Sequence, residues 1–227
     1  MAEHFAITAK NRVRRYPQRA RYDKATVYAI LDAAWVAHVA FVKDGAPRII
    51  PTLFARRDDT LLLHGAPASG LLRHIGAGGE VAVSVALVDG LVVAKRVADL
   101  AVNYRSVVVF GRGRLLEDEA EKRAALHHLT ERLVPGHWGA SNEPTASDLR
   151  AVAVAEIAIE SASAKVRTAL PDDRAEARTL PVWAGFVPIQ QVMGQPVTAD
   201  YAADRDPPRP LLEMIARWAS PPPTVKE

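Results

Sequence analysis

Residues 46–73, APRIIPTLFARRDDTLLLHGAPASGLLR, hold the pattern that decides the fold. Apolar residues alternate with polar ones along 48–55 and again along 60–64, and a polar segment at 56–59 separates the two runs. Two alternating runs joined by a short polar turn are typical of a β-hairpin. We therefore expect these two runs to pair with each other.

A turn of small residues, HGAPASG at 64–70, follows the second run and precedes a short helical pattern at 71–75. Ser69 stands at the start of that helix, where backbone N–H groups have no partner within the helix. Free N–H groups beside a hydroxyl suit a phosphate group, so the turn predicts an anion site. On its own, Ser69 is an ordinary helix cap and His64 a structural residue.

Arginines would strengthen an anion site at this turn if the fold brought them to it. Arg48, Arg73 and Arg105 are the candidates, although each of them taken singly is an ordinary surface charge. The planar guanidinium group matches phosphate oxygens better than the point charge of a lysine does. The hypothesis is therefore a convergence of the Ser69 turn and one or more arginines on one anion.

Alternating patterns recur along the rest of the chain. They predict further strands at 35–42, 80–88, 91–97, 104–116 and 154–166. Turn signals stand at Lys43-Asp44-Gly45 and at Asp89-Gly90, and Gly111 and Gly113 indicate a bulge or a bend within a long strand.

The strands together predict the fold class. Six or seven antiparallel strands, with turns every eight to twelve residues or so, form a small β-barrel with peripheral helices. Helices are expected after the capping residue Asp23, at 118–133 after Asp118, and at 211–218. The long helix at 118–133 favours Greek-key connections over a simple up-and-down barrel.

Composition limits the class of protein. Of 227 residues, 49% are hydrophobic, and 29 basic against 26 acidic residues give a net charge of +3, which is too small to indicate nucleic acid. Because there is no cysteine, disulfides, thiolate metal sites and cysteine nucleophiles are excluded. No signal sequence and no apolar run near ~18 residues are present, so we expect a soluble cytoplasmic protein without membrane spans.

Three parts are expected along the chain: a basic arm at 1–22, a main domain at 23–190 and an extension at 191–227 with a disordered Pro-rich end. The arm is interpreted either as a solvated basic tail or as a segment that folds over an anionic ligand. Nucleic-acid binding is the weakest interpretation, because Tyr16 and Tyr22 are the only aromatic residues near the arm's arginines that could stack on bases.

Motifs for metal binding or nucleophilic catalysis are missing. His127 and His128 are adjacent and point to different sides of a helix, and His127 with Glu131 lacks a third ligand, so no metal site is predicted. Neither a G-x-S-x-G elbow nor a Walker or Rossmann glycine pattern occurs. Catalytic residues stay unidentified.

Several blocks nevertheless occur in an order that resembles a known family. They span about residues 12–190 and include PRIIPT at 47–52, LHG at 63–65 with Ser69, DGLV at 89–92, NYRSVVVFG at 103–111, KVR at 165–167 and VWAG at 182–185 with Pro188. Together they resemble the flavin-nucleotide-binding proteins related to pyridoxamine 5′-phosphate oxidases and 5-nitroimidazole reductases.

The resemblance implies a split β-barrel that forms a homodimer, with FMN in a cleft at the subunit interface. The flavin ring would lie against the strand at 48–54 and the phosphate near 64–73. The cofactor-binding residues implied in this way are Arg48, Ile50, Pro51, Thr52, Leu53, His64, Gly65, Ser69, Arg73, Tyr104, Arg105, Ser106 and Trp183.

One position departs from the family pattern. Relatives often carry a basic residue directly after the serine, where this chain has Gly70. We therefore expect the phosphate contact to be lost or to have moved to Arg73, Arg105 or the basic arm. FMN is the expected cofactor, and FAD, a deazaflavin or haem are the alternatives that the resemblance leaves open.

The function implied is that of an oxidoreductase passing hydride or electrons from a nicotinamide donor through the flavin to a small-molecule acceptor. The cofactor would carry the chemistry, which agrees with the lack of acid–base motifs. The alternatives are a flavin-binding protein without catalysis and a split barrel that holds haem or a deazaflavin.

Overall fold

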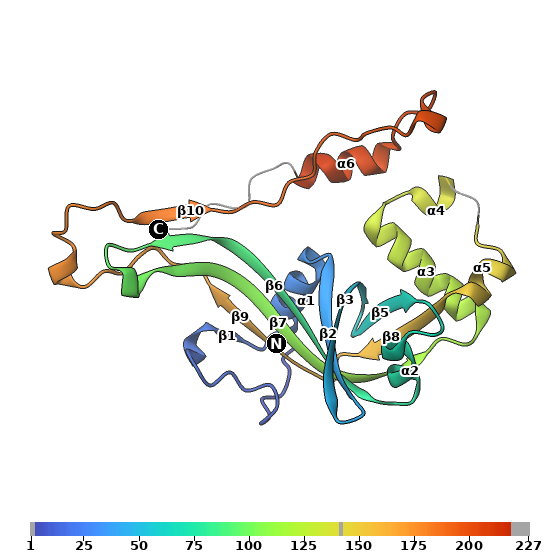
Figure 1. Ribbon diagram of the computed structural model, residues 1–227, viewed down its shortest axis with the longest axis horizontal. Helices are drawn as coiled ribbons and strands as arrows, with labels where there is room; N and C mark the ends of the chain where they lie inside the picture. The colour runs from blue at the N-terminus through green and yellow to red at the C-terminus, as the bar shows by residue number, and fades with distance from the viewer. Residues whose placement is uncertain (1–2, 141–142, 219–227) are drawn as a thin grey trace.

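The computed structural model describes residues 3–140 and 143–218 (Figure 1). Within these ranges ten strands join into one sheet. The strands are β1 Ala20–Arg21, β2 Val36–Lys43, β3 Ala46–Leu53, β4 Ala55–Arg57, β5 Thr60–Gly65, β6 Glu80–Val93, β7 Ala101–Leu115, β8 Ala153–Ala158, β9 Ser161–Arg167 and β10 Gly185–Pro188. The helices are α1 Lys24–Ala33, α2 Gly70–Gly76, α3 Glu119–Leu133, α4 His137–Ala140, α5 Ala146–Ala151 and α6 Arg209–Trp218. Short 3₁₀ turns are η1 Pro17–Arg19, η2 Val97–Asp99, η3 Ala175–Ala177 and η4 Asp200–Ala202.

The sheet is antiparallel and runs in the order β3-β2-β6-β7-β8-β5-β4, with β9 on β7 and β10 on β6. The predicted class, mainly β with peripheral helices, is confirmed. Seven of the ten described strands have six residues or more, and β1, β4 and β10 are the short ones.

The sheet bends where β7 changes partners. Phe110 is the last residue of β7 opposite β9, and Gly113 is the first opposite β8. A Cβ atom at Gly111 would lie 1.9 Å from the carbonyl oxygen of Ala158, and one at Gly113 would lie 2.4 Å from that of Glu156. Glycine is therefore required for the two strands to approach, which confirms the bend predicted at these positions.

The core lies between the inner face of the sheet and helices α1 and α2. Alternate residues of β2, β6 and β7, including Val39, Val83 and Val109, are almost completely buried. Helix α1 covers this face because its apolar side chains recur at helical spacing. Asp23 caps α1 by accepting a hydrogen bond from the Thr26 amide at 2.8 Å.

The pairing expected for the opening hairpin is wrong. β3 pairs with β2, through the two-residue turn Asp44-Gly45, whose positive φ angles of 52° and 74° suit a tight hairpin. β5 pairs instead with the short β4, through the turn Asp58-Asp59. Between β3 and β4 the buried Phe54 marks the point at which the chain leaves one strand pair for the next.

Two other strand predictions need correction. Asp89-Gly90 is no turn, because β6 continues through a bulge between Val88 and Gly90 and forms a long hairpin with β7. The run 154–166 forms two strands, β8 and β9. The Pro-rich end of the chain that was expected to be disordered lies outside the described residues.

The N-terminal arm packs on the barrel from residue 3 onward. Phe5 is 8% exposed, and the buried Asn11 side chain donates to the carbonyl oxygens of Ala6 at 2.9 Å and Ala162 at 3.1 Å. β1 then pairs with β9. The interpretation of the arm as a solvated tail is therefore wrong for these residues. None of the helices in the described ranges has the length and apolar character needed to cross a bilayer.

Candidate functional site

β3 is an edge strand that exposes both of its faces. It pairs only with β2, and Ile49 is 63% exposed. Pro47 and Pro51 fit such an edge, because a proline nitrogen can be accommodated where it faces away from the neighbouring strand. The amide groups of Ile49 and Leu53 have the same parity along the strand, so they also face outward. These outward groups can donate to the edge of a flat ring.

The five predicted residues of β3 divide between its two faces. Arg48, Ile50 and Thr52 stand opposite the buried Phe41, Val39 and Ala37 of β2. Pro51 and Leu53 stand on the outer face with His38 and Val36. A ligand at the free edge can therefore contact both sets.

The turn after β5 brings a guanidinium group to Ser69. Arg73 donates from a terminal nitrogen to the carbonyl oxygen of Ala68 at 2.8 Å, so its side chain folds back over the turn. The Ser69 hydroxyl accepts from the Leu72 amide at 3.5 Å. His64 is exposed at the end of β5 and precedes Gly65. The four predicted residues His64, Gly65, Ser69 and Arg73 thus follow one another along the end of β5, the turn and α2.

Gly70 faces open space. A Cβ atom there would have no heavy atom within 4 Å. The absence of a basic residue at this position is therefore not imposed by packing, and the Arg73 guanidinium is the cation that the structure places at the turn.

The remaining predicted residues stand elsewhere on the sheet. Tyr104 and Ser106 lie on the outer face of β7, opposite Arg167 and Lys165 of β9. Arg105 points to the other side and forms a two-pronged ion pair with Asp89, its terminal nitrogen 2.7 Å from the carboxylate. These hydrogen bonds to Asp89 raise the pKa of Arg105 and neutralise its charge.

Trp183 is 63% exposed and lies against Gly185 at the start of β10. Figure 1 places β10 toward one end of the molecule and α2 toward the other. Within one chain, therefore, the residues of β3, β5 and α2 do not form one cluster with Trp183.

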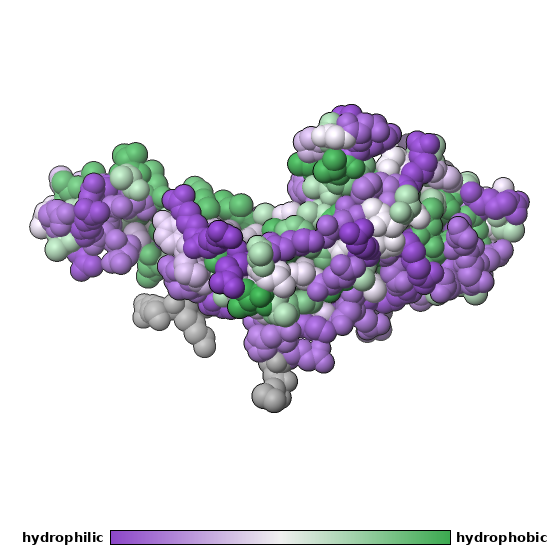
Figure 2. All heavy atoms as spheres, turned by 90° about the horizontal axis from the view of Figure 1, so that it is seen from below, coloured by the Kyte–Doolittle hydropathy of each residue, from purple (hydrophilic) through white to green (hydrophobic). Residues whose placement is uncertain are grey.

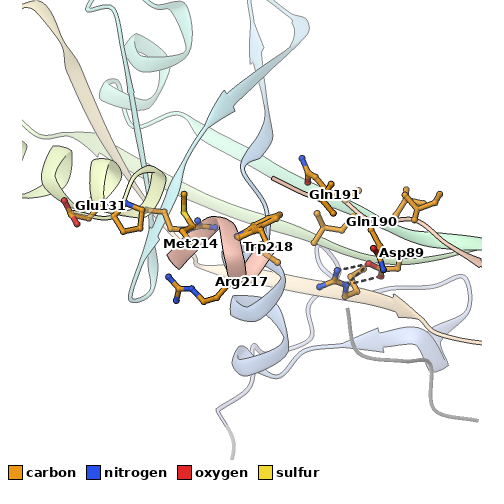
Figure 3. Close-up of a pocket in the computed structure, with 16 residues that line it drawn as sticks. Asp89, Glu131, Gln190, Gln191, Met214, Arg217 and Trp218 are labelled. Atoms are coloured by element: carbon orange, nitrogen blue, oxygen red, sulfur yellow. Dashed lines mark hydrogen bonds and ion pairs between the residues drawn. The ribbon is translucent and has the colours of Figure 1, made fainter. Parts of the chain in front are cut away.

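A cavity that the sequence did not reveal lies between the barrel and the C-terminal segment. Its volume is about 820 Å³, and it is lined from β6, α3, α6 and residues 189–192. Figure 3 shows Met214 and Trp218 of α6 reaching into it, with the Arg105–Asp89 pair on the other side. The sequence predicts the helix at 211–218, but it does not show which part of the barrel this helix packs against.

Helix α6 is held at this cavity by contacts between aromatic rings. The rings of Trp35 and Trp218 lie 5.2 Å apart, and the Arg132 guanidinium lies 5.0 Å from the Trp35 ring. Burial lowers the pKa of Arg132, which also donates to the carbonyl oxygens of Asp32 and Ala34. The helix at the end of the described chain is thus docked on α3 and the start of β2.

The helix histidines have structural partners. The His127 ring lies 5.3 Å from that of Trp138, and Nε2 of His128 is 2.9 Å from the carbonyl oxygen of Arg56. Within the described ranges, no three acidic or histidine side chains lie close enough together to hold a metal ion.

With this geometry established, comparison with known proteins shows the family. Residues 23–166 match the family model described as pyridoxamine 5′-phosphate oxidase. The chain belongs to the pyridoxamine 5′-phosphate oxidase family. This confirms the resemblance that the sequence blocks indicated.

Two solved structures of this family are similar over most of their length. The flavocytochrome Anf3 from Azotobacter vinelandii is 37% identical, with a TM-score of 0.84 over 91% of this chain and 96% of that one. The FAD and heme binding protein from Mycobacterium smegmatis is 34% identical, with a TM-score of 0.82 over 87% of this chain and 97% of that one.

A more distant structure shows the split-barrel fold alone. It is described as a 5-nitroimidazole antibiotic resistance protein from Bacteroides thetaiotaomicron, with 22% identity and a TM-score of 0.56 over 65% of this chain and 86% of that one. The search of curated proteins gave no match. The family model ends at residue 166, so the first two structures share with this chain a large part of what lies outside it.

Proposed function

We propose that this protein is a flavin-dependent redox protein that works as a homodimer in the cytoplasm. The observation that carries the proposal is similarity along nearly the whole chain to a flavocytochrome and to an FAD- and haem-binding protein. FMN is the cofactor that the sequence blocks favour, and FAD is the one that the second of these relatives binds.

The residues around β3 and α2 fit a flavin. The outward amides of Ile49 and Leu53 are donors for the oxygen and nitrogen atoms at the ring edge, and the exposed Ile50 supplies an apolar contact for the ring. Arg73 and the Ser69 hydroxyl fit a phosphate of the ribityl chain. When bound, the flavin would accept a hydride or electrons from a nicotinamide donor and pass them to a small acceptor.

The chain's own part in this chemistry would be to bind and orient the cofactor. Arg73 would neutralise phosphate charge, and the β3 edge would orient the ring without any acid–base group. This division of labour agrees with the lack of a catalytic motif in the sequence.

A second copy of the chain would complete the cleft. The far end of the β6–β7 hairpin, on the left in Figure 2, carries exposed hydrophobic residues. We call it the hairpin end, and its exposed hydrophobic residues include Val97, Leu100, Val182 and Trp183. Exposed apolar surface of this kind marks an interaction site. We assign Tyr104, Ser106 and Trp183 to the wall that one protomer offers to the flavin of its partner.

Purification without added cofactor tests the proposal. We expect flavin absorption and a flavin mass, a dimer by light scattering, and reduction by NADH or NADPH faster than that of free flavin. A colourless protein that takes up neither FMN nor FAD would overturn it. A protein that binds flavin but accelerates no reduction would be a flavin-binding protein without catalysis.

Gly70 gives a matched pair of variants. Because a side chain at this position meets open space, Gly70→Lys should tighten FMN binding about tenfold by adding a charge-assisted contact to the phosphate. Gly70→Ala supplies a side chain without the charge and should leave affinity within twofold. Arg73→Ala should weaken FMN binding by about tenfold or more.

Haem is a second cofactor that one observation favours. His38 is exposed on the outer face of β2, where Val36 and Val42 of the same strand also stand, and it lies between Pro51 of β3 and Ser84 of β6. The His38 ring forms no hydrogen bond to another of the described residues, and imidazole is a common axial ligand of haem iron. The residues present therefore fit one end of a haem.

An absorption spectrum separates the cofactors. A Soret band near ~400 nm that survives in His64→Ala and disappears in His38→Ala would support His38 as the haem ligand. A Soret band in both variants would exclude His38, and a deazaflavin would show neither flavin nor haem bands.

A further inference from the structure

Three cations surround Tyr16, and Arg167 lies near the charge of one of them, Arg19. The Tyr16 ring centroid lies 5.3 Å from the Arg15 guanidinium, 4.2 Å from that of Arg19 and 5.6 Å from Nζ of Lys165. Arg167 lies two residues beyond Lys165 on the same face of β9. None of these four side chains forms an ion pair with an acidic group in residues 3–140 or 143–218. We call Arg15, Tyr16, Arg19, Lys165 and Arg167 the Tyr16 cluster.

Arg167 shows most clearly that the cluster lacks a partner. One terminal nitrogen donates to Oδ1 of the buried Asn103 at 2.7 Å, which is a neutral acceptor. Its Nε is buried and has no hydrogen-bond partner among the described residues. Burial and the nearby charge of Arg19 both lower the pKa of Arg167. By contrast, Asp89 neutralises Arg105 on the neighbouring strand.

The cluster is held in place by a hydrogen bond and a strand pairing. Asn11 anchors the arm to Ala162 of β9, and the pairing of Ala20 with Lys165 joins the end of the arm to the same strand. Tyr16 has φ 57°, a left-handed conformation that is costly for a bulky side chain. Strain of this kind persists where surrounding structure imposes it, and it is found at ligand-binding positions.

The outer face beside the cluster offers aromatic and hydroxyl groups. In the antiparallel register, Arg167 is opposite Tyr104 and Lys165 is opposite Ser106. A ligand held by the four cations would therefore also reach the ring of Tyr104 and the hydroxyl of Ser106. Two tyrosine rings with four unneutralised cations suit a ligand that carries both several negative charges and a flat base.

We propose that the Tyr16 cluster binds the diphosphate group of a dinucleotide, with an adjoining base against Tyr16 or Tyr104. A diphosphate matches the cluster better than a single phosphate does, because it carries more charge and more acceptor oxygens for three guanidinium groups and one ammonium group. FAD and the nicotinamide dinucleotides share this chemistry. Where the dinucleotide is FAD, the assignment rests on the proposed flavin function.

Calorimetry on cofactor-free protein tests the proposal, with inorganic pyrophosphate, FMN, FAD and NADPH as separate probes. Arg19→Gln with Lys165→Gln removes two of the cations, and both side chains are partly exposed. The double variant should weaken pyrophosphate and at least one dinucleotide by about a hundredfold, roughly tenfold for each cation, and change FMN by less than twofold.

Arg14→Gln is the matched control, because Arg14 is an exposed arginine of the same arm outside the cluster. It lowers the net charge by one and should change pyrophosphate affinity by less than twofold. Thermal unfolding of each variant verifies that the fold is retained. A Tyr16→Gly variant relieves the strained backbone and should weaken the dinucleotide more than pyrophosphate, because it removes the ring and keeps the cations.

The outcomes separate the two proposals. If FMN or FAD binds and the double variant changes the affinity for none of pyrophosphate, FAD and NADPH, the cluster assignment is wrong while the flavin function stands. If no flavin binds but NADPH and pyrophosphate bind through the cluster, the flavin function is wrong and the assignment stands. Binding of duplex DNA or phosphatidylserine vesicles through the cluster, with no response to pyrophosphate, would overturn the assignment.

Discussion

The barrel end and the hairpin end of this molecule use similar apolar residues with opposite results. At the barrel end, Leu63 and Ile157 are almost completely buried between the sheet and its helices. At the hairpin end, where β6 and β7 extend beyond β2 (Figure 1), Val97 is 86% exposed and Leu100 is exposed as well. One end buries its apolar surface within a single chain, and the other does not.

The difference separates folding from assembly. Burial of apolar area contributes roughly 25 cal/mol per Å², so the barrel end supplies most of the stability that one chain can obtain. The hairpin end gains the same benefit only when another surface covers it. The proposed dimer provides that surface, and the predictions below test the contrast between the two ends.

Alanine substitutions at two glycines, one at each end, test this difference, because each adds a Cβ atom that overlaps a neighbouring backbone carbonyl oxygen. Gly111→Ala would push a Cβ atom against the carbonyl oxygen of Ala158 where β7 changes partners. We expect a loss of more than about 4 kcal/mol in the free energy of unfolding, or an insoluble protein. Gly90→Ala meets Phe186 and the carbonyl oxygen of Val187 at the hairpin end, so it should detach β10 and leave the barrel folded.

Urea unfolding measures the free energy of unfolding of the two variants, and limited proteolysis measures whether β10 is detached. Gly90→Ala should retain the main transition while cleavage after residue 167 becomes faster. Equal loss of stability in both variants would show that the two ends fold as one cooperative unit.

Substitution of one leucine by alanine at each end compares the stability that a buried and an exposed leucine contribute. Leu63→Ala should cost about 2–5 kcal/mol, because it leaves a cavity in the core. Leu100→Ala should change the free energy of unfolding of a monomer by less than about 0.5 kcal/mol, since Leu100 is exposed. Unfolding at several protein concentrations checks the comparison. A cost for Leu100→Ala that grows with protein concentration would place this residue in the dimer interface.

Asn11→Ala tests whether the arm belongs to the barrel end. The variant removes the side-chain hydrogen bonds to Ala6 and Ala162 and should cost about 1–3 kcal/mol. Hydrogen exchange should quicken in residues 3–22, with the β6 core unchanged. Unchanged exchange in the arm would mean that Phe5 and the β1–β9 pairing are sufficient to hold it.

Asp23→Ala should have the smallest effect of the substitutions at the barrel end, because it removes a single helix cap. The hydrogen bond from Thr26 lowers the pKa of Asp23 in the folded protein below its ordinary value of 3.8. The cap therefore contributes at pH above about 4, and its contribution is lost as the pH falls through the lowered pKa. The variant should cost about 1 kcal/mol at pH 7 and less at pH 3. An equal cost at both pH values would exclude the ionised cap as the source.

Local signals in the sequence are sufficient to predict where several helices, turns and bends occur. Asp23 and Asp118 begin their helices as predicted, and Asp44-Gly45 forms the expected turn, because capping and turn geometry depend on a few neighbouring residues. Gly111 and Gly113 were identified correctly for the same reason, since a close strand crossing excludes a side chain.

Contacts between residues far apart in the sequence could not all be predicted from the sequence pattern. The turn at Asp44-Gly45 correctly indicates that β2 and β3 pair. Alternation alone does not show which other strand 48–55 pairs with, so the expected pairing with 60–64 is wrong. Asp89 was interpreted as a turn residue, although its carboxylate is the partner of Arg105 sixteen residues later. The cavity beside Met214 and the cluster around Tyr16 are also built from segments that are far apart in the sequence. The sequence indicates that the arm is basic, but not that its cations meet those of β9.

The prolines of β3 have one more consequence. An edge strand with exposed isoleucine and leucine side chains is a template on which other chains can add strands and aggregate. Pro47 and Pro51 remove two of the amide donors that such addition needs, while the outward amides of Ile49 and Leu53 remain. The same edge is thereby left open to a small molecule and closed to an incoming polypeptide.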